Sequence, residues 1–216
     1  MNTHTSDLRD GRSVRAERVQ SANHDRLLAA ARTLLDRNEG VEITAQQIAN
    51  EAGVSTATVY NHFPGSVPEI LLAIGNAVVD TAVHEVQVVL DTRGPAAAAR
   101  LLPLHVCEGV ATLGKGAIEI LRARDVTGAS FFGREPKPEV VLIGLLQDAA
   151  VEGDGDIQAA AKMIAYLVRG AIFSFALHAA EDFQRSTATT AAQLVAVGAT
   201  ATDVCLRVHD LSLPPE

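Results

Sequence analysis

The sequence predicts an all-α protein with about nine helices. Apolar residues recur along most of the chain at the three- and four-residue spacing of a helix face. Glycine and proline separate these segments, as at Pro64-Gly65, at Arg93-Gly94-Pro95 and from Gly153 to Gly155. No segment alternates polar and apolar residues for long enough to indicate a strand. A hydrophobic content of 48% over 216 residues is ample for a buried core, in one large or two small domains.

The first 20 residues are polar and carry arginines at three-residue spacing, diluted by acids: Arg9, Arg12, Arg15 and Arg18. We predict a flexible N-terminal arm over residues 1–20, either a solvated tail or a basic arm that reaches DNA. A first helix should follow from Ser21 to Asn38, with its leucines and alanines at helical spacing. Glu39-Gly40 should end it.

Residues 43–63 read as two short helices joined by a tight turn. Thr44 and Gln47 have the spacing of a capping box, so the first helix should begin at this threonine. Gly53 stands where a helix end needs positive φ, which only glycine adopts without strain. Ser55 can cap the second helix. This pattern predicts a helix-turn-helix, which presents its second helix to a DNA major groove.

The polar side chains of the two short helices are the candidate DNA contacts. Tyr60 and His62 can donate to phosphate, and Thr56 and Thr58 can touch a base edge or a thymine methyl. Hydroxyls and amides at a helix N-terminus favour phosphate. The alternative is that these polar side chains only form the exposed face of a surface helix. The full predicted set is Thr44, Gln46, Ser55, Thr56, Thr58, Tyr60, Asn61 and His62.

Three segments, residues 26–35, 39–44 and 48–63, resemble the N-terminal domain of the tetracycline-repressor (TetR) family of transcriptional regulators. The turn glycine, Tyr60, His62 and Phe63 all fall in the family's register. The resemblance implies a homodimer whose N-terminal domains bind a palindromic operator and whose C-terminal domain holds an effector. Family members commonly carry a lysine at the start of the fourth helix, where this chain has Ser66. A cationic phosphate contact is therefore expected to be absent.

Beyond the helix-turn-helix domain, residues 21–65, we expect a larger helical domain over residues 66–216 for effector binding and dimerisation. A long helix should run over residues 66–90 and connect the two domains. Shorter helices are expected over residues 96–113, 117–126 and 138–151. Two longer apolar helices should close the chain, from Asp156 to about Asp182 and from Ser186 to about Val208.

The two closing helices are more apolar than a monomer surface tolerates, which predicts a dimer interface. Its expected residues are Met163, Leu167, Ala171, Leu194, Val197, Ala201 and Val204. Helices between residues 96 and 151 would then enclose most of an effector pocket. The pocket residues we expect are His105, Arg122, Phe131, Phe132, Leu142 and Phe175. With no tryptophan and 4% aromatic residues, an aliphatic or weakly acidic ligand is favoured over a lipophilic cation.

Catalytic, metal and cofactor motifs are absent from the sequence. Asp154-Gly-Asp156 resembles the start of a calcium loop but lacks its glycine and its closing glutamate. His105 and Cys107 do not share a helix face, so they read as packed side chains rather than metal ligands. No nucleophile, base and orienting acid form a recognisable motif. We therefore expect no enzyme activity, no metal and no cofactor.

Charge and cysteine content limit which partners and which cellular compartment are expected. The net charge of −8 and a pI near 5.3 argue against a general nucleic-acid coat. Residues 1–62 carry a net −1 and residues 63–216 a net −7, so the acidity lies away from the candidate DNA site. Two cysteines and a polar N-terminus indicate a cytoplasmic protein. The apolar stretch over residues 163–180 contains Arg169, which favours a buried or interfacial helix over a membrane span.

Together these features predict a dimeric transcriptional repressor that binds double-stranded DNA. An unidentified small molecule is expected to release this repressor from its palindromic operator. Two alternatives remain open on the sequence. The first is a constitutive DNA-binding regulator without an effector. The second is a small-molecule enzyme or scavenger with a vestigial DNA-binding domain.

Overall fold

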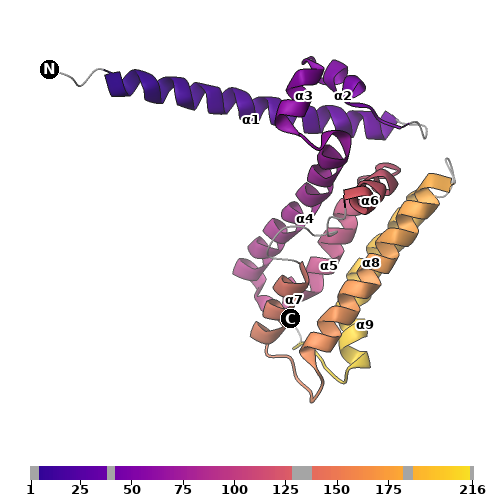
Figure 1. Cartoon of the computed structure of the whole chain (residues 1–216). Helices are drawn as coiled ribbons and strands as arrows, with labels where there is room; N and C mark the ends of the chain where they lie inside the picture. The colour runs from indigo at the N-terminus through magenta and orange to yellow at the C-terminus, as the bar shows by residue number, and fades with distance from the viewer. Residues whose placement is uncertain (1–4, 38–41, 128–137, 182–186, 215–216) are drawn as a thin grey trace. The chain divides into compact units, whose positions relative to one another are not determined.

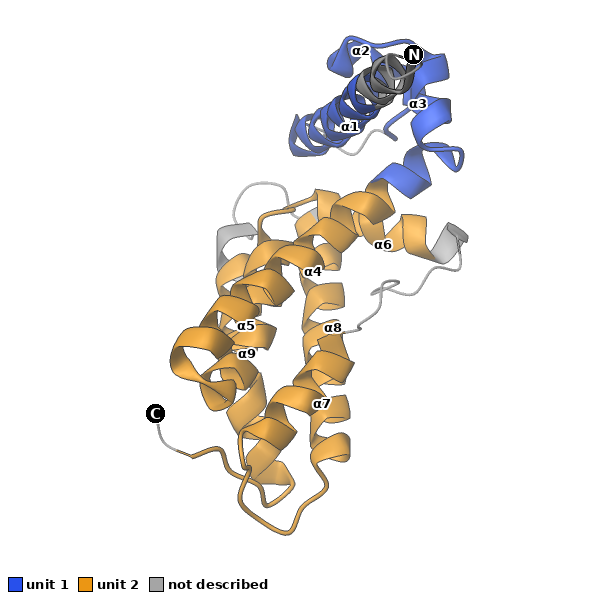
Figure 2. Cartoon of the chain, turned by 90° about the vertical axis from the view of Figure 1, so that its left-hand side faces the viewer, with its two compact units in different colours: residues 1–70 blue, residues 71–216 orange. Residues whose placement is uncertain are grey.

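The computed structural model describes residues 5–37, 42–127, 138–181 and 187–214, and within these residues the chain forms nine helices (Figure 1). Their bounds are α1 Thr5–Arg37, α2 Ala45–Ala52, α3 Thr56–His62, α4 Ser66–Arg93, α5 Pro95–Ala111, α6 Gly116–Thr127, α7 Pro138–Asp148, α8 Ile157–Glu181 and α9 Thr187–Val208. The predicted all-α class is confirmed. The chain divides into two compact units, residues 1–70 and 71–216 (Figure 2).

The core of the first unit is formed where α2 and α3 lie against the C-terminal half of α1 (Figure 1). Leu27 and Ala31 of α1, Ile48 of α2 and Val59 of α3 are completely buried. Their spacing puts one apolar stripe of each helix toward the centre, as expected for short helices that are stabilised by packing rather than by propensity.

Helix α1 begins at Thr5, so residues 5–20 are helical and continuous with the first helix, where we expected a flexible arm. Residues 5–37 contain no proline, and most are ordinary or good helix formers. Once the packed half of α1 is formed, each added residue only has to propagate the helix, which is far less costly than nucleating one. The helix shows the local conformation of residues 5–20, and the flexibility of this segment stays a prediction.

The second unit is a bundle in which α5 packs on α9 and α8 lies beside α9 (Figure 1). Gly198 of α9 permits the close approach to α5, because a Cβ at this position would lie 2.8 Å from the Pro103 carbonyl oxygen and 2.9 Å from Cys107 Sγ. The buried Thr202 hydroxyl donates to the Ala99 carbonyl oxygen at 2.9 Å. Pro103 lies within α5 without ending it.

Three further sets of contacts hold the ends of the last helices. The Asp156 carboxylate accepts from the Gln158 backbone N–H at 2.8 Å, so Asp156 caps α8. Glu152, before α8, and Ser212, after α9, form an isolated antiparallel bridge with N···O distances of 3.0 and 2.9 Å. Arg100 pairs with Asp203 at 3.1 Å and donates to the Pro214 carbonyl oxygen at 3.3 Å. The C-terminal segment is therefore held against the bundle.

Candidate nucleic-acid interface

The caps predicted for α2 and α3 are both present. The Thr44 hydroxyl accepts from the Gln47 N–H at 3.3 Å, and the Gln47 side-chain oxygen accepts from the Thr44 N–H at 2.8 Å. The Ser55 hydroxyl accepts from the Thr58 N–H at 3.1 Å. Gly53 adopts φ 65° and ψ 37° between the two helices. These local hydrogen bonds end α2 and begin α3 within four residues, as a helix-turn-helix requires.

Arg26 of α1 holds the C-terminal end of α2, a role that the sequence did not predict. Its guanidinium donates to the Ala52 carbonyl oxygen at the C-terminal end of α2. A cation at this end satisfies an otherwise unpaired carbonyl and interacts favourably with the helix dipole. Farther along α1, Arg37 pairs with Glu51 at 3.2 Å. Only the tertiary arrangement shows these contacts, since Arg26 lies 26 residues before its partner.

The predicted DNA-contact residues share the surface of the two short helices. Thr44, Gln46, Ser55, Tyr60 and Asn61 are exposed, and Tyr60 exposes 50% of its surface. Thr56, Thr58 and His62 are half-buried.

Hydrogen bonds organise this surface before any partner binds. The Thr56 hydroxyl donates to Gln46 Oε1 at 2.8 Å, and the Gln46 amide donates to Asn50 Oδ1 at 2.9 Å. The Ser55 and Thr58 hydroxyl oxygens lie 2.8 Å apart. A hydroxyl that donates to a neighbour keeps lone pairs to accept from an outside donor.

His24 of α1 lies beside the C-terminal end of α3. Its ring stacks on Phe63 with centroids 4.9 Å apart, and its centroid lies 6.5 Å from that of His62. Phe63 itself is buried. The ring contacts therefore hold the end of α3 against α1, and His62 sits at the edge of this aromatic cluster with access to solvent.

Helix α4 begins without a cation. Ser66, at the position where the resemblance suggested a lysine, adopts φ 57°, and its N–H donates to the Phe63 carbonyl oxygen at 2.8 Å. The Glu69 carboxylate accepts from the Gly65 N–H at 2.7 Å. A carboxylate at a helix N-terminus is electrostatically favourable for the helix, but it occupies the place where a phosphate could bind.

Residues 27–74 match the family model for bacterial regulatory proteins of the tetR family. The chain carries the DNA-binding domain of the TetR family. The match begins at the first fully buried residue of α1 and extends into α4, so it includes the capped turn and the surface of α3.

Solved structures of TetR-family regulators share the fold over most of the chain. A TetR-family regulator from Rhodococcus sp. RHA1 has a TM-score of 0.55 at 20% identity, and the alignment covers 87% of this chain and 97% of that one. The TetR-family repressor FadR from Thermus thermophilus, solved with lauroyl-CoA, has a TM-score of 0.54 at 24% identity over 82% and 94% of the two chains. The regulator PfmR, also from Thermus thermophilus, gives 0.54 at 20% identity over 84% and 97%. No curated protein sequence matches the chain.

A mostly apolar cavity lies in the second unit, between α4, α5, α6 and α8. It is narrow, with a cavity volume of about 20 Å³, and part of it is open to solvent. Leu72, Gly75 and Val79 of α4 form one wall, and its polar groups are Asn76 and Arg124.

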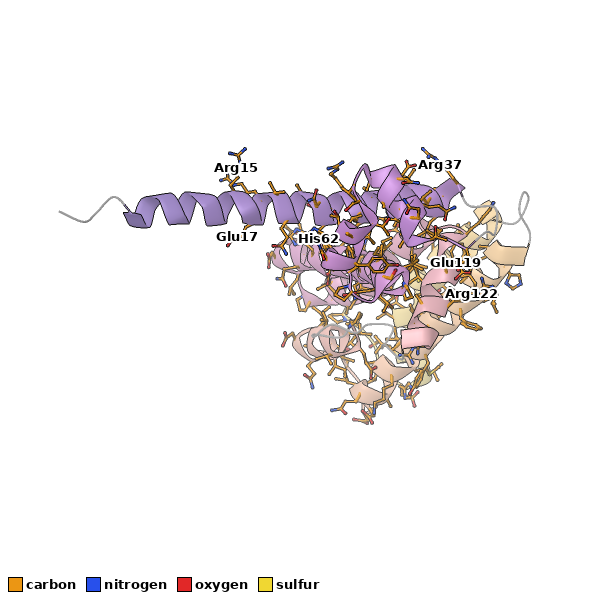
Figure 3. The ribbon with its side chains drawn as sticks, turned by 45° about the horizontal axis from the view of Figure 1, so that its top comes forward. Arg15, Glu17, Arg37, His62, Glu119 and Arg122 are labelled. Atoms are coloured by element: carbon orange, nitrogen blue, oxygen red, sulfur yellow. The ribbon has the colours of Figure 1, made fainter. Side chains whose placement is uncertain are left out.

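Among the pocket residues expected from the sequence, the four that the structure describes do not line this cavity. His105 Nδ1 lies 3.3 Å from Glu85 and 3.2 Å from Glu108, and exposed Arg122 pairs with Glu119 at 2.7 Å (Figure 3). Leu142 is buried in α7, and Phe175 lines a separate hollow on α8 and α9. Phe131 and Phe132 lie outside the described residues. The predicted pocket residues therefore stay a prediction, because a hydrophobic stripe does not tell which of its members face empty space.

The expected interface residues divide into two groups. Leu167 and Val204 each expose 40%, whereas Leu194 and Ala201 are buried within the protomer. Met163, Ala171 and Val197 are half-buried. The sequence missed several exposed apolar residues of the same helices: Tyr166, Phe173, Leu177 and Val208.

By length and composition, α4, α8 and α9 could each cross a membrane. In the protomer only 39% of the most apolar window of α8 and 33% of that of α9 are buried. Much of the apolar character of these two helices is therefore left at the protomer surface.

Proposed function

We propose that the chain is a cytoplasmic, homodimeric transcriptional repressor that a small-molecule effector releases from a palindromic operator. The observation that carries this proposal is the capped pair α2 and α3, whose exposed polar surface belongs to the unit that matches the TetR family. The alternatives without DNA binding leave this surface without a role.

In this proposal α3 enters the major groove of DNA. Thr56 and Thr58 lie in its first turn and help to read bases, and Tyr60 and His62 donate to phosphate. Thr44 and Gln46 at the start of α2 lie against the backbone, where hydroxyl, amide and helix N–H groups favour phosphate.

A palindromic site requires two reading helices related by a two-fold axis, about 34 Å apart. The exposed apolar surface of α8 and α9 supports such a dimer. Tyr166, Phe173 and Leu177 of α8 expose 65%, 50% and 39%, and Val208 of α9 exposes 61%. Apolar patches of this kind on a soluble protein mark interaction sites, and a self-complementary patch closes a two-fold dimer.

The cavity between α4, α5, α6 and α8 is the proposed effector site. One continuous helix, α4, contributes Ser66 to Ile70 to the DNA-binding unit and Leu72 to Val79 to the cavity wall. A ligand that binds one position of this wall better than another shifts the population of DNA-binding states. The aliphatic lining with one cationic group favours a ligand with an apolar chain and an acidic group. The structure of FadR in complex with lauroyl-CoA supports a ligand of this kind.

Selection from a random duplex library with the purified protein tests the DNA-binding function. The selected duplexes should contain a palindrome with half-sites about one helical turn apart. Light scattering of the complex should give the mass of a bound dimer. Failure to enrich any duplex would contradict the proposal and favour the scavenger or enzyme alternative.

The effector arm of the test uses medium-chain saturated fatty acids and acyl-CoAs as probes. We expect a coupling free energy on the order of 1 to 3 kcal/mol between the two sites. Ligand should lower the affinity for DNA, and operator DNA should lower the affinity for ligand by the same factor. If no probe changes the affinity for the selected operator and none raises the melting temperature of the protein, the protein is a constitutive regulator instead.

A further inference from the structure

An open groove lies beside the recognition helix, between α3 and the N-terminal half of α1. Figure 1 shows α1 continuing well past α2 and α3 toward the N-terminus. The groove is lined by Arg15, Val19, Gln20 and Asn23 of α1 and by Asn61 and His62 of α3, among others. It is widely open to solvent, and its volume is about 550 Å³. Three residues of the predicted N-terminal arm, Arg15, Val19 and Gln20, therefore belong to one wall of this groove.

The chemistry of the groove suits an anion. Arg15 supplies a positive charge, and Asn23 and Asn61 supply amide donors. Among the described residues that line the groove, none carries a carboxylate. Glu17, the nearest acid along α1, is not among the residues that line the groove, although Figure 3 draws it on the side of α1 where His62 lies and draws Arg15 on the other side.

We propose that this groove seats the sugar-phosphate backbone of the same duplex whose major groove α3 enters. The inference rests on the proposed function and adds a contact that the helix-turn-helix does not supply. Asn61 and His62 belong both to α3 and to the groove, so a strand that leaves the major groove beside α3 passes directly along α1. Arg15 then provides the cationic phosphate contact that Ser66 cannot make.

The shape of the groove distinguishes a polymer from a small effector. A small-molecule pocket buries most of its ligand, whereas this groove is open along one side. Val19 exposes 55% at the groove, an apolar surface of the size to rest on a deoxyribose. Phosphate, sugar and amide contacts of this kind position a protein on DNA without reading sequence.

The test compares Arg15→Gln with Arg32→Gln on a duplex selected by the wild-type protein. Both substitutions remove one charge from an exposed α1 arginine, but only Arg15 lines the groove. Arg15→Gln should lower affinity by about tenfold. It should also reduce the slope of log K against log salt by about 0.9 for each phosphate that is no longer neutralised, hence about 1.8 for a dimer. Arg32→Gln should leave both the affinity and the slope within error of the wild-type values.

Neutral methylphosphonates placed singly along the half-site locate the contact. At one flanking position the methylphosphonate should lower the affinity of the wild-type protein for the duplex. It should leave the affinity of Arg15→Gln unchanged, because that variant already lacks the interaction. If the wild-type protein binds the duplex but the two arginine variants behave alike, the groove does not seat DNA and the proposed function stands. A change of base preference in Arg15→Gln, in place of uniform weakening, would also overturn a backbone seat. If the wild-type protein enriches no duplex at all, the proposed function itself is wrong.

Discussion

The hydroxyl of Thr56 on α3 donates a 2.8 Å hydrogen bond to the Gln46 side-chain oxygen on α2. Two residues that the sequence suggested as independent DNA contacts thus form one unit across the turn. The bond orders both side chains before DNA arrives, which lowers the entropy lost on binding.

The Thr56–Gln46 bond predicts that the two residues act non-additively on DNA affinity. Thr56→Val and Gln46→Ala should each weaken binding, and the double variant should be less impaired than the sum by about 0.5 to 1.5 kcal/mol. A double-mutant cycle on the selected operator measures this coupling. Strictly additive losses would show that the bond does not persist in the complex. Thr56→Val together with Thr33→Val provides the control, since the Thr33 hydroxyl bonds only within α1, to the Ala29 carbonyl oxygen.

Tyr60 is expected to contact phosphate. Tyr60→Phe removes only the hydroxyl, so affinity should fall by a similar factor on the selected operator and on its point variants. Thr56→Ala should instead alter preference at one position in each half-site. Binding to a panel of single-base variants separates the two patterns. Base-specific loss in Tyr60→Phe would place this residue on a base edge.

Arg26 should matter for stability of the DNA-binding unit. Arg26→Ala leaves the Ala52 carbonyl unpaired at the end of α2, and we expect a loss of about 1 to 2 kcal/mol. Arg32→Ala on the exposed face of α1 is the matched control and should change stability by less than about 0.5 kcal/mol. Chemical denaturation followed by circular dichroism measures both, and equal values would remove the capping role of Arg26.

The close contact of α5 with α9 depends on Gly198. Gly198→Ala places a methyl group 2.8 Å from the Pro103 carbonyl oxygen, so the helices must separate, at a cost of about 1 to 3 kcal/mol. Gly144→Ala in α7 meets no atom within 4 Å and should instead stabilise by up to about 1 kcal/mol through helix propensity. Thermal melting of the two variants should therefore shift in opposite directions.

Cys107 makes stability fall at alkaline pH. Burial, with a contribution from Glu108, raises the pKa of its thiol from 9.0 to about 12. Between these values the unfolded chain loses the proton while the folded chain keeps it, so ionisation favours unfolding. The contribution of this thiol is complete below about pH 9 and is lost by about pH 12. Denaturation midpoints from about pH 8 to 11 should decline less steeply in Cys107→Ala than in the wild-type protein, and parallel curves would contradict this account.

Sequence and structure agree best where the physics is local. The Thr44 and Ser55 caps and the glycine turn were predictable, because each depends on residues within four positions. The inward facing of Leu194 and the exposure of Phe173 were not, since an apolar stripe fits either a core or an interface. The bond from Arg26 to Ala52 and the groove beside Arg15 depend on tertiary packing, which no local pattern encodes.

Gly75 stands on the α4 wall of the cavity, and a Cβ there would lie 2.9 Å from Ile120 Cγ2. In a genetic selection for cells that stay repressed when inducer is added, larger residues at this position should recur, since they fill the cavity while leaving α2 and α3 intact. Cells that lose repression altogether should instead carry changes in the capped turn. The two phenotypes would then separate along the chain, with changes that abolish the response to inducer after Leu71 and changes that abolish operator recognition before it.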